Sequence, residues 1–219
     1  VEKACAQLKE RFCAIAAEIL GCAADELAFE DGRVVRESTG ETVSLPAIAE
    51  KSQCNSCQLA EATAMHSSPV SPPPFMVGMA EIELDRETGT VEVLNFDAVV
   101  DCGIPINPAL ARIQVEGGIV QGIGHTLMED VTRTPKGAIR ESSLFTYRLP
   151  TRLDVGDIRV EFEHSYEPTG PFGAKSIGEI VINTPAPAIA HAIYRATGVW
   201  HRELPILPEH VLLAKPEAD

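Results

Sequence analysis

A helical segment rich in glycine, residues 107–130, does most to constrain how this chain can fold. Asn107 followed by Pro108 is the N-cap and first-turn proline that mark the start of a helix. Apolar residues then recur at helical spacing through the rest of the segment. Four glycines interrupt the same pattern: Gly117, Gly118, Gly122 and Gly124. Each costs about 1 kcal/mol relative to alanine, so a helix keeps them only where another group must come very close.

Two glutamines flank two of these glycines on one face of the predicted helix. The residues follow i, i+3, i+4, i+7 spacing and are Gln114, Gly117, Gly118 and Gln121. Such a face is a flat strip without side chains between two amides. An amide donates and accepts hydrogen bonds at once, which suits a polar heterocycle or an oxo group. These residues alone support a second interpretation equally well, in which the glycines let a neighbouring helix pack tightly.

A second informative segment, residues 170–182, places a glutamate where a glycine-punctuated loop opens into an apolar, helix-like run. The glycines at 170, 173 and 178 permit positive φ and let another group approach the backbone. Glu179 at the mouth of a helix can face a bound ligand and, if shielded from water, act as a base. The alternative is an ordinary loop in which Glu179 caps a helix.

These two segments belong to a series of sequence blocks in a fixed order. The blocks are D-C-G-I-P-I-N-P (101–108), Q-V-E-G-G-I-V-Q-G-I-G (114–124), G-P-F-G-A-K-S-I-G-E (170–179), T-P-A-P-A-I-A-H-A-I-Y-R-A-T-G (184–198) and R-E-L-P-I-L-P-E-H-V-L (202–212). In this order they resemble the molybdenum-binding subunit of the xanthine dehydrogenase / aldehyde oxidase family. The resemblance is good from about Phe75 to Leu213 and weaker before Phe75.

The resemblance implies roles for individual residues. Glu179 is the general base that takes a proton as a water-derived oxygen attacks an electron-poor carbon. Gln114 hydrogen-bonds the molybdopterin cofactor near the metal. The predicted cofactor-binding residues are Gln114, Gly117, Gly118, Gln121, Lys175 and Ser176, and no side chain of the chain is expected to be a metal ligand. Lys175 and Ser176 are included as neighbours on the loop that positions the base.

The resemblance also implies a reaction and partners. The expected function is part of a molybdenum hydroxylase that oxidises an N-heterocycle such as a purine. Because such subunits are several times longer, we expect this chain to be a C-terminal portion, either a split subunit or an excised domain. The expected partners are the remaining portion of the molybdenum subunit and the iron–sulfur and flavin (FAD) subunits or domains. A nicotinate or aldehyde dehydrogenase of the same family, and a non-catalytic structural domain, are the alternatives.

Charge and hydropathy narrow the possible partners. The chain carries a net charge of −14 without an evident basic cluster, which argues against a nucleic-acid partner. No apolar run reaches the roughly 18–20 residues of a membrane span. The cysteines are spread in a way that fits a reducing cytoplasm better than a secreted disulfide scaffold.

One cysteine pair needs a separate interpretation. Cys54 and Cys57 form a C-x-x-C motif that could serve zinc or redox chemistry. A structural zinc site needs four ligands, and no second pair has matching spacing; His66 alone adds little. The chain also lacks the cysteine pattern of an iron–sulfur cluster.

The remaining patterns predict a mixed α+β fold in three parts. The first part, 1–50, contains an amphipathic helix over 1–20, a hairpin around Asp31-Gly32, a short strand within 38–45 and a helical turn over 45–50. The second, 51–74, is a proline-rich linker. The third, 75–219, is the molybdopterin-binding C-terminal portion. Its expected elements are strands over 75–84, 90–100 and 158–164 and a helix over 185–197.

Overall fold

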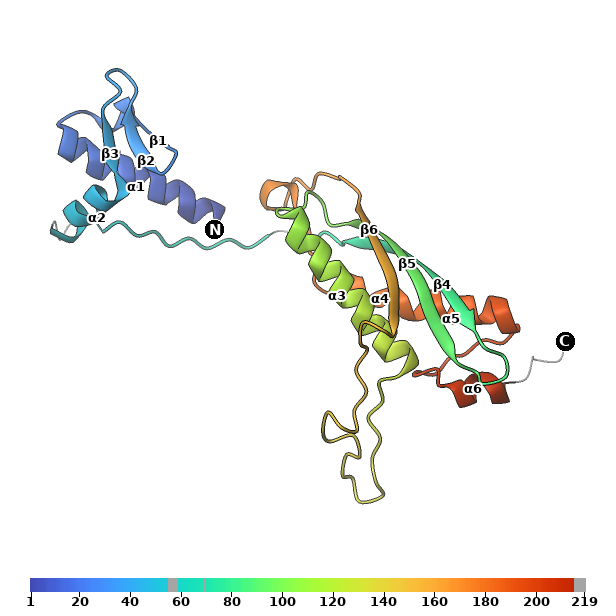
Figure 1. Ribbon diagram of the computed structural model, residues 1–219. Helices are drawn as coiled ribbons and strands as arrows, with labels where there is room; N and C mark the ends of the chain where they lie inside the picture. Colours follow the sequence, from blue (N-terminus) through green and yellow to red (C-terminus); the bar gives the residue numbers. More distant parts are fainter. Residues whose placement is uncertain (55–58, 69, 215–219) are drawn as a thin grey trace. The chain divides into compact units, whose positions relative to one another are not determined.

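The computed structural model describes residues 1–54, 59–68 and 70–214. The chain divides into two compact units, Val1–Ser68 and Pro69–Asp219 (Figure 1). Each unit has a hydrophobic core of its own. The candidate site lies entirely in the second unit.

In the first unit, two helices pack on a small antiparallel sheet. The elements are α1 (Glu2–Leu20), the short 3-10 helix η1 (Ala24–Glu26), β1 (Leu27–Glu30), β2 (Arg33–Arg36), β3 (Thr42–Ser44) and α2 (Leu45–Cys54), with strand order β1-β2-β3. Ile15, Val34 and Ile48 are buried between helices and sheet. The first helix ends as predicted at Gly21, which caps it in the left-handed conformation (φ 66°).

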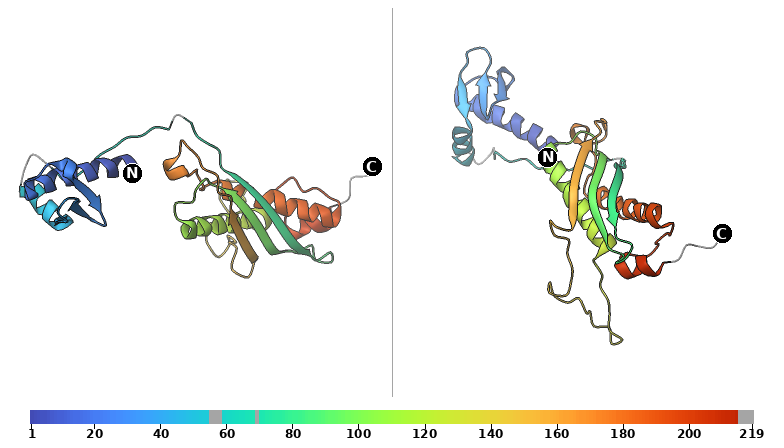
Figure 2. Two further views of the ribbon diagram at one scale, coloured as in Figure 1. Left: turned by 90° about the horizontal axis from the view of Figure 1, so that it is seen from above. Right: turned by 45° about the vertical axis from the view of Figure 1, so that its right-hand side comes forward.

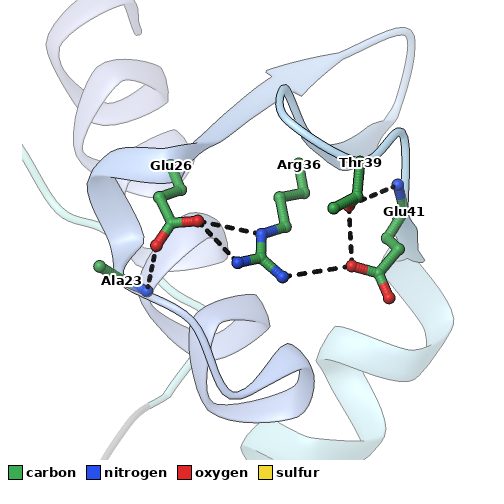
Figure 3. Close-up of polar contacts among 5 residues, drawn as sticks. All are labelled: Ala23, Glu26, Arg36, Thr39 and Glu41. Carbon is green, nitrogen blue, oxygen red and sulfur yellow. Dashed lines mark hydrogen bonds and ion pairs between the residues drawn. The ribbon is translucent and has the colours of Figure 1, made fainter.

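A polar network fixes the end of β2 against its neighbours (Figure 3). The guanidinium of Arg36 donates to Glu26 over 2.8 Å and to Glu41 over 3.3 Å, and Glu41 also accepts from the Thr39 hydroxyl. The hydrogen bond from Arg36 lowers the pKa of the Glu26 carboxyl. Because these groups are exposed to water, the network orders the hairpin more than it stabilises the unit.

The second unit is built on a mixed three-stranded sheet. Its strands are β4 (Phe75–Leu84), β5 (Val91–Asp101) and β6 (Val155–Phe162), in the order β4-β5-β6. The first two strands, both predicted from the sequence, pair as an antiparallel hairpin, whereas β6 runs parallel to β5. A parallel neighbour needs a long crossover connection, and α3 (Pro108–Leu127) with the following loop provides it. The α+β class is confirmed, because this single crossover is not repeated.

Two helices, α3 and α5 (Pro185–Thr197), cover one face of this sheet (Figure 2). Their buried side chains include Val115, Ile119 and Ile123 from α3 and Ile189 and Ile193 from α5. They form one core with Phe96, Val100 and Val160 of the sheet. The short elements η2 (Pro171–Gly173), α4 (Ile180–Asn183) and α6 (Pro208–Leu213) complete the unit.

Several boundaries differ from the sequence prediction. The helical turn predicted over 45–50 continues to Cys54, so α2 enters the segment predicted as a linker; residues 59–68 and 70–74 contain no helix or strand. The strand predicted over 158–164 begins earlier, at Val155, and ends at Phe162. Gly156 weakens the strand signal there, yet a Cβ at this position would lie 1.9 Å from the carbonyl oxygen of Leu94. Of the C-x-x-C pair, Cys57 lies outside the described residues.

Candidate functional site

A cleft of about 660 Å³ opens between α3 and α4. The residues that line it are Leu110, Ile113, Gln114, Gly117, Gly118, Gln121, Gly178, Glu179, Val181 and Ile182. Both predicted glutamines, the two glycines between them and the predicted base therefore border one hollow. The helix and the glutamate are more than fifty residues apart in sequence, and the packing of α4 on α3 brings them together.

The four glycines of α3 serve different purposes. A Cβ on Gly118 would lie 2.1 Å from Cγ2 of Val181, and one on Gly122 would lie 2.6 Å from Cγ of Pro185. These two glycines are therefore required for tight helix packing, which was the alternative interpretation of the sequence. A Cβ on Gly117 would meet nothing within 4 Å. Gly117 is thus an α3 glycine that borders the cleft and that internal packing does not explain.

The Gln114 side chain connects α3 to the loop that carries Glu179. Its Nε2 donates to the carbonyl oxygen of Gly178 over 3.3 Å. This bond uses the amide nitrogen and leaves Oε1 as an acceptor. Gln121, the second glutamine of the strip, is exposed at the edge of the same cleft.

Glu179 occupies the N-cap position of α4 but does not cap it. Its side chain accepts no bond from the backbone of the helix. Within residues 1–54, 59–68 and 70–214, no hydrogen-bond or ion-pair partner of its carboxylate is found. The helix-capping alternative therefore fails, and the carboxylate is exposed at the cleft.

Lys175 is held by an acidic partner on the strand that precedes α3. Its ammonium lies 2.5 Å from Oδ2 of Asp101, and the two side chains are 9% and 21% exposed. Asp101 also accepts from the Ser165 hydroxyl and from the Gly103 N–H. Burial raises the pKa of the Asp101 carboxyl, but the hydrogen bonds from Lys175, Ser165 and Gly103 outweigh it, so the net shift is downward.

Lys175 and Ser176 lie outside the cleft that the other predicted cofactor-binding residues line, although Lys175 shares an adjoining hollow with Gln114. Neither lines the 660 Å³ cleft, and Ser176 is exposed on the loop. Asp101 lies 74 residues from Lys175 and 64 residues from Ser165, so spacing along the chain does not reveal these contacts.

Backbone contacts reinforce this ion pair. The N–H of Lys175 donates to the carbonyl of Cys102 over 2.7 Å, and the N–H of Ile104 donates to Gly173 over 2.9 Å. Gly103 adopts φ 68°, and a Cβ there would lie 2.2 Å from the carbonyl oxygen of Gly173. The end of β5 and the loop that leads to Glu179 are thus fixed to each other.

A second hollow of about 350 Å³ adjoins the cleft at Gln114 and Gly178. Its wall is mainly apolar and includes Ile104, Ile106, Leu110 and Ile177. Cys102 and Lys175 also line it, and burial raises the pKa of the Cys102 thiol. The combined hollow offers an amide, a carboxylate and an apolar recess along one surface.

These residues fit a large polar cofactor better than a bare metal ion. Gly117 leaves the floor of the cleft open for close approach, and Gln114 and Gln121 supply amides on either side of it. Among the described residues, no three His, Cys, Asp or Glu side chains gather to hold a metal ion.

The mixed sheet, the glycine-bearing crossover helix and the cleft beside it define an α+β cofactor-binding domain. The family model of the molybdopterin cofactor-binding domain matches residues 1–156, well over half of the chain. This chain belongs to that family. The resemblance to molybdenum-binding subunits of the xanthine dehydrogenase / aldehyde oxidase family is thereby confirmed.

The chain is similar to parts of several oxidases, dehydrogenases and oxidoreductases. Probable hypoxanthine oxidase XdhD of Escherichia coli K12 is 35% identical over 209 residues, which cover 94% of this chain and 22% of that protein. The 6-hydroxypseudooxynicotine dehydrogenase complex subunit gamma of Paenarthrobacter nicotinovorans is 32% identical over 219 residues, covering 95% and 28%. Quinoline 2-oxidoreductase from Pseudomonas putida 86 has a solved structure that matches with a TM-score of 0.75 at 28% identity, covering 96% and 29%.

The chain spans roughly a quarter of the length of each of these relatives, from 22% to 29%. Its fold is accordingly one part of a larger molecule in those proteins. Among the described residues, no helix is both long and apolar enough to cross a membrane.

Proposed function

We propose that this chain supplies one wall of the molybdopterin site in a molybdenum hydroxylase that oxidises an N-heterocycle such as a purine. Glu179 is the general base, and Gln114 holds the cofactor. The observation that carries the proposal is the shared cleft, which gathers Gln114, Gly117 and Glu179 on one surface. The carboxylate of Glu179 does not cap α4.

Each residue has a task that follows from its contacts. Gln114, anchored through Nε2 to Gly178, presents Oε1 to accept a hydrogen bond from a polar ring. Gly117 keeps a side chain out of the floor, so that the cofactor can lie against the backbone of α3, and Gly118 beside it lets Val181 of α4 pack closely against the helix. Gln121 extends the polar strip by one further turn.

Glu179 is suited to take a proton from the attacking water-derived oxygen. Its carboxylate has no partner in the described part of the chain, so accepting a proton breaks no internal bond. The Asp101–Lys175 pair and the adjoining backbone bonds hold the loop behind it in place. When bound, the molybdenum cofactor supplies the redox change and the metal that acidifies water.

The rest of the enzyme must come from elsewhere. The cleft is open to solvent at Gln114, Gln121 and Glu179, so a second wall is needed to exclude water. We assign that wall to the remaining portion of the molybdenum subunit. Iron–sulfur and flavin domains or subunits carry the electrons away, and the assembly operates in the cytoplasm.

We choose a purine as the substrate because this chain is similar to a probable hypoxanthine oxidase. The second candidate is a different N-heterocycle or an aldehyde, favoured by the 6-hydroxypseudooxynicotine dehydrogenase and quinoline 2-oxidoreductase relatives. A non-catalytic domain is the third alternative, and the free carboxylate of Glu179 argues against it.

The test is the substitution Glu179→Gln in the complete enzyme, measured as turnover together with molybdenum per complex. The loss of a general base reduces turnover by about 10²- to 10⁴-fold, while metal content stays at the wild-type level. Glu163→Gln, which changes an exposed carboxylate outside the cleft, is the matched control. Wild-type turnover in Glu179→Gln would refute the assignment of the base.

Two further measurements separate cofactor binding from substrate choice. Gln114→Leu should lower molybdenum per complex without changing the fold, as measured by circular dichroism. Unchanged metal content in that variant would remove Gln114 from the cofactor site. Turnover of xanthine and hypoxanthine, compared with nicotinate and an aromatic aldehyde, decides between the substrate classes.

A further inference from the structure

Lys175 lies where the loop that carries Glu179 meets one end of the three-stranded sheet. The start of β4 and the ends of β5 and β6 lie together at this end, because β5 pairs antiparallel with β4 and parallel with β6 (Figure 1). Each of these strands provides a residue, at or just beyond its end, that contacts Lys175 or its partner. The three residues are Phe75, Asp101 and Ser165.

The ammonium of Lys175 lies between an anion and an aromatic ring. It is 2.5 Å from Oδ2 of Asp101 and 5.6 Å from the centroid of the Phe75 ring. Phe75 and Asp101 are directly opposite each other on neighbouring strands, so their side chains leave the same face of the sheet. Ser165 donates to Oδ1 of Asp101 and so helps to orient the carboxylate. We call Phe75, Asp101, Ser165 and Lys175 the lysine clasp.

The clasp already uses the charge of Lys175. The side chain is only 9% exposed, and its ammonium is paired with a carboxylate. An anionic ligand would have to draw the ammonium away and leave Asp101 partly buried without its cation, which is unfavourable. These contacts favour a role for Lys175 in holding the loop over the cofactor-binding role predicted from the sequence.

The loop between Lys175 and Glu179 has no regular structure of its own. Its residues belong to no helix or strand, and Gly178 forms a turn with Glu179. A Cβ at Gly178 would meet nothing within 4 Å, so packing against Gly178 does not hold the loop. The loop is held instead by the clasp, by Ile177 packed against the core and by Gln114, whose Nε2 donates to the Gly178 carbonyl over 3.3 Å.

We propose that Lys175 is a positioning residue for Glu179, and that the lysine clasp fixes the loop so that the base faces the cleft. The inference rests on the proposed function, in which Glu179 is the general base. A base must lie within hydrogen-bond reach of the proton that it takes, and a displacement of about 1 Å can reduce the rate about 10²-fold. Phe75 and Ser165, which do not line the cleft, then contribute to turnover through Lys175 and Asp101.

Lys175→Met in the complete enzyme is the first test. It should lower kcat by about tenfold or more, while KM and molybdenum per complex stay within about twofold of wild type. Amide hydrogen exchange within 176–180 should become faster. Lys136→Met, which changes an exposed lysine outside the clasp, should alter none of these quantities. Molybdenum per complex that falls together with kcat would make Lys175 a cofactor-binding residue and overturn the proposal, as would wild-type kcat and exchange.

A double variant shows whether Lys175 acts through the base. Because the two residues then serve one step, adding Lys175→Met to Glu179→Gln should lower the residual turnover by less than about twofold. A further loss as large as that of Lys175→Met alone would show that Lys175 acts by another route, and would overturn the positioning role. Wild-type turnover in Glu179→Gln alone is a different result: it refutes the base itself, and the positioning role falls with it.

Two milder variants test the outer members of the clasp and do not depend on Lys175→Met folding. Phe75→Leu and Ser165→Ala keep the ion pair and should each lower kcat by about two- to fivefold, with faster exchange within 176–180. Phe145→Leu makes the matched change at an exposed phenylalanine outside the clasp and should leave both quantities at wild-type values. Wild-type kcat and exchange in both Phe75→Leu and Ser165→Ala would overturn the role of the clasp.

Discussion

The ammonium of Lys175 lies 2.5 Å from the carboxylate of Asp101, and this contact joins the two segments that form the candidate site. Asp101 ends β5 shortly before α3, which carries Gln114. Lys175 lies on the loop that leads to Glu179. The pair is thus a positioning device: it touches neither side of the cleft, yet it fixes the loop that bears the proposed base.

Breaking this pair should destabilise the second unit. Lys175→Met leaves the Asp101 carboxylate partly buried without its cation and should reduce the free energy of unfolding by about 2 kcal/mol, below the value for fully buried pairs because both groups keep some exposure. The single tryptophan, Trp200, lies in the second unit, so its fluorescence during urea unfolding reports that unit. Lys136→Met, which changes an exposed lysine in the loop between α3 and β6, is the control. Equal midpoints for the two variants would contradict the prediction.

The same pair predicts how stability depends on pH. The folded-state pKa of Asp101 is lowered, so its contribution is present above the unfolded pKa of about 3.9 and is lost as the pH falls through the folded value. The difference in unfolding free energy between wild type and Asp101→Asn should therefore be full at pH 7 and shrink below about pH 4. A difference that stays constant from pH 7 to pH 3 would exclude this linkage.

Two adjacent glycines of α3 should respond oppositely to the same change. Gly118→Ala places a Cβ against Val181 and should destabilise the unit by about 1–3 kcal/mol. Gly117→Ala meets open space and should stabilise the helix by up to about 1 kcal/mol. Urea unfolding measures both.

Gly117→Ala has a second readout in the complete enzyme. If the cofactor lies against Gly117 as proposed, the added methyl group intrudes on it, and molybdenum per complex should fall although the fold is more stable. Wild-type metal content in that variant would show that the cofactor does not approach α3 at this position.

The anchoring of the loop 131–153, which connects α3 to β6, can be tested at Tyr147. The hydrogen bond to Glu129 raises the pKa of the Tyr147 hydroxyl, so this contact persists at neutral pH and is lost only as the hydroxyl ionises at high pH. Tyr147→Phe removes the bond and should speed amide hydrogen exchange within 141–150. The amide hydrogens of α3, which lies outside this segment, should exchange at wild-type rates. Unchanged exchange within 141–150 would mean that other contacts hold this loop.

Local sequence patterns determined most individual elements. The strand over 75–84 and the helix over 185–197 occur at the predicted bounds, and the glycine-rich helix differs by a few residues at its end. These signals are local: alternation of apolar residues, an Asn-Pro helix start and a terminal glycine at 198 are complete within one segment. The ordered sequence blocks also identified the family.

Only the tertiary structure decided how these segments cooperate. The parallel pairing of β6 with β5, the contact of Lys175 with Asp101 and the packing of Val181 on Gly118 join residues more than sixty positions apart. Sequence periodicity records which face of an element is apolar, but not which distant element covers it. For the same reason, α3 shows four similar glycines in sequence, whereas in the fold Gly118 and Gly122 serve packing and Gly117 borders the cleft.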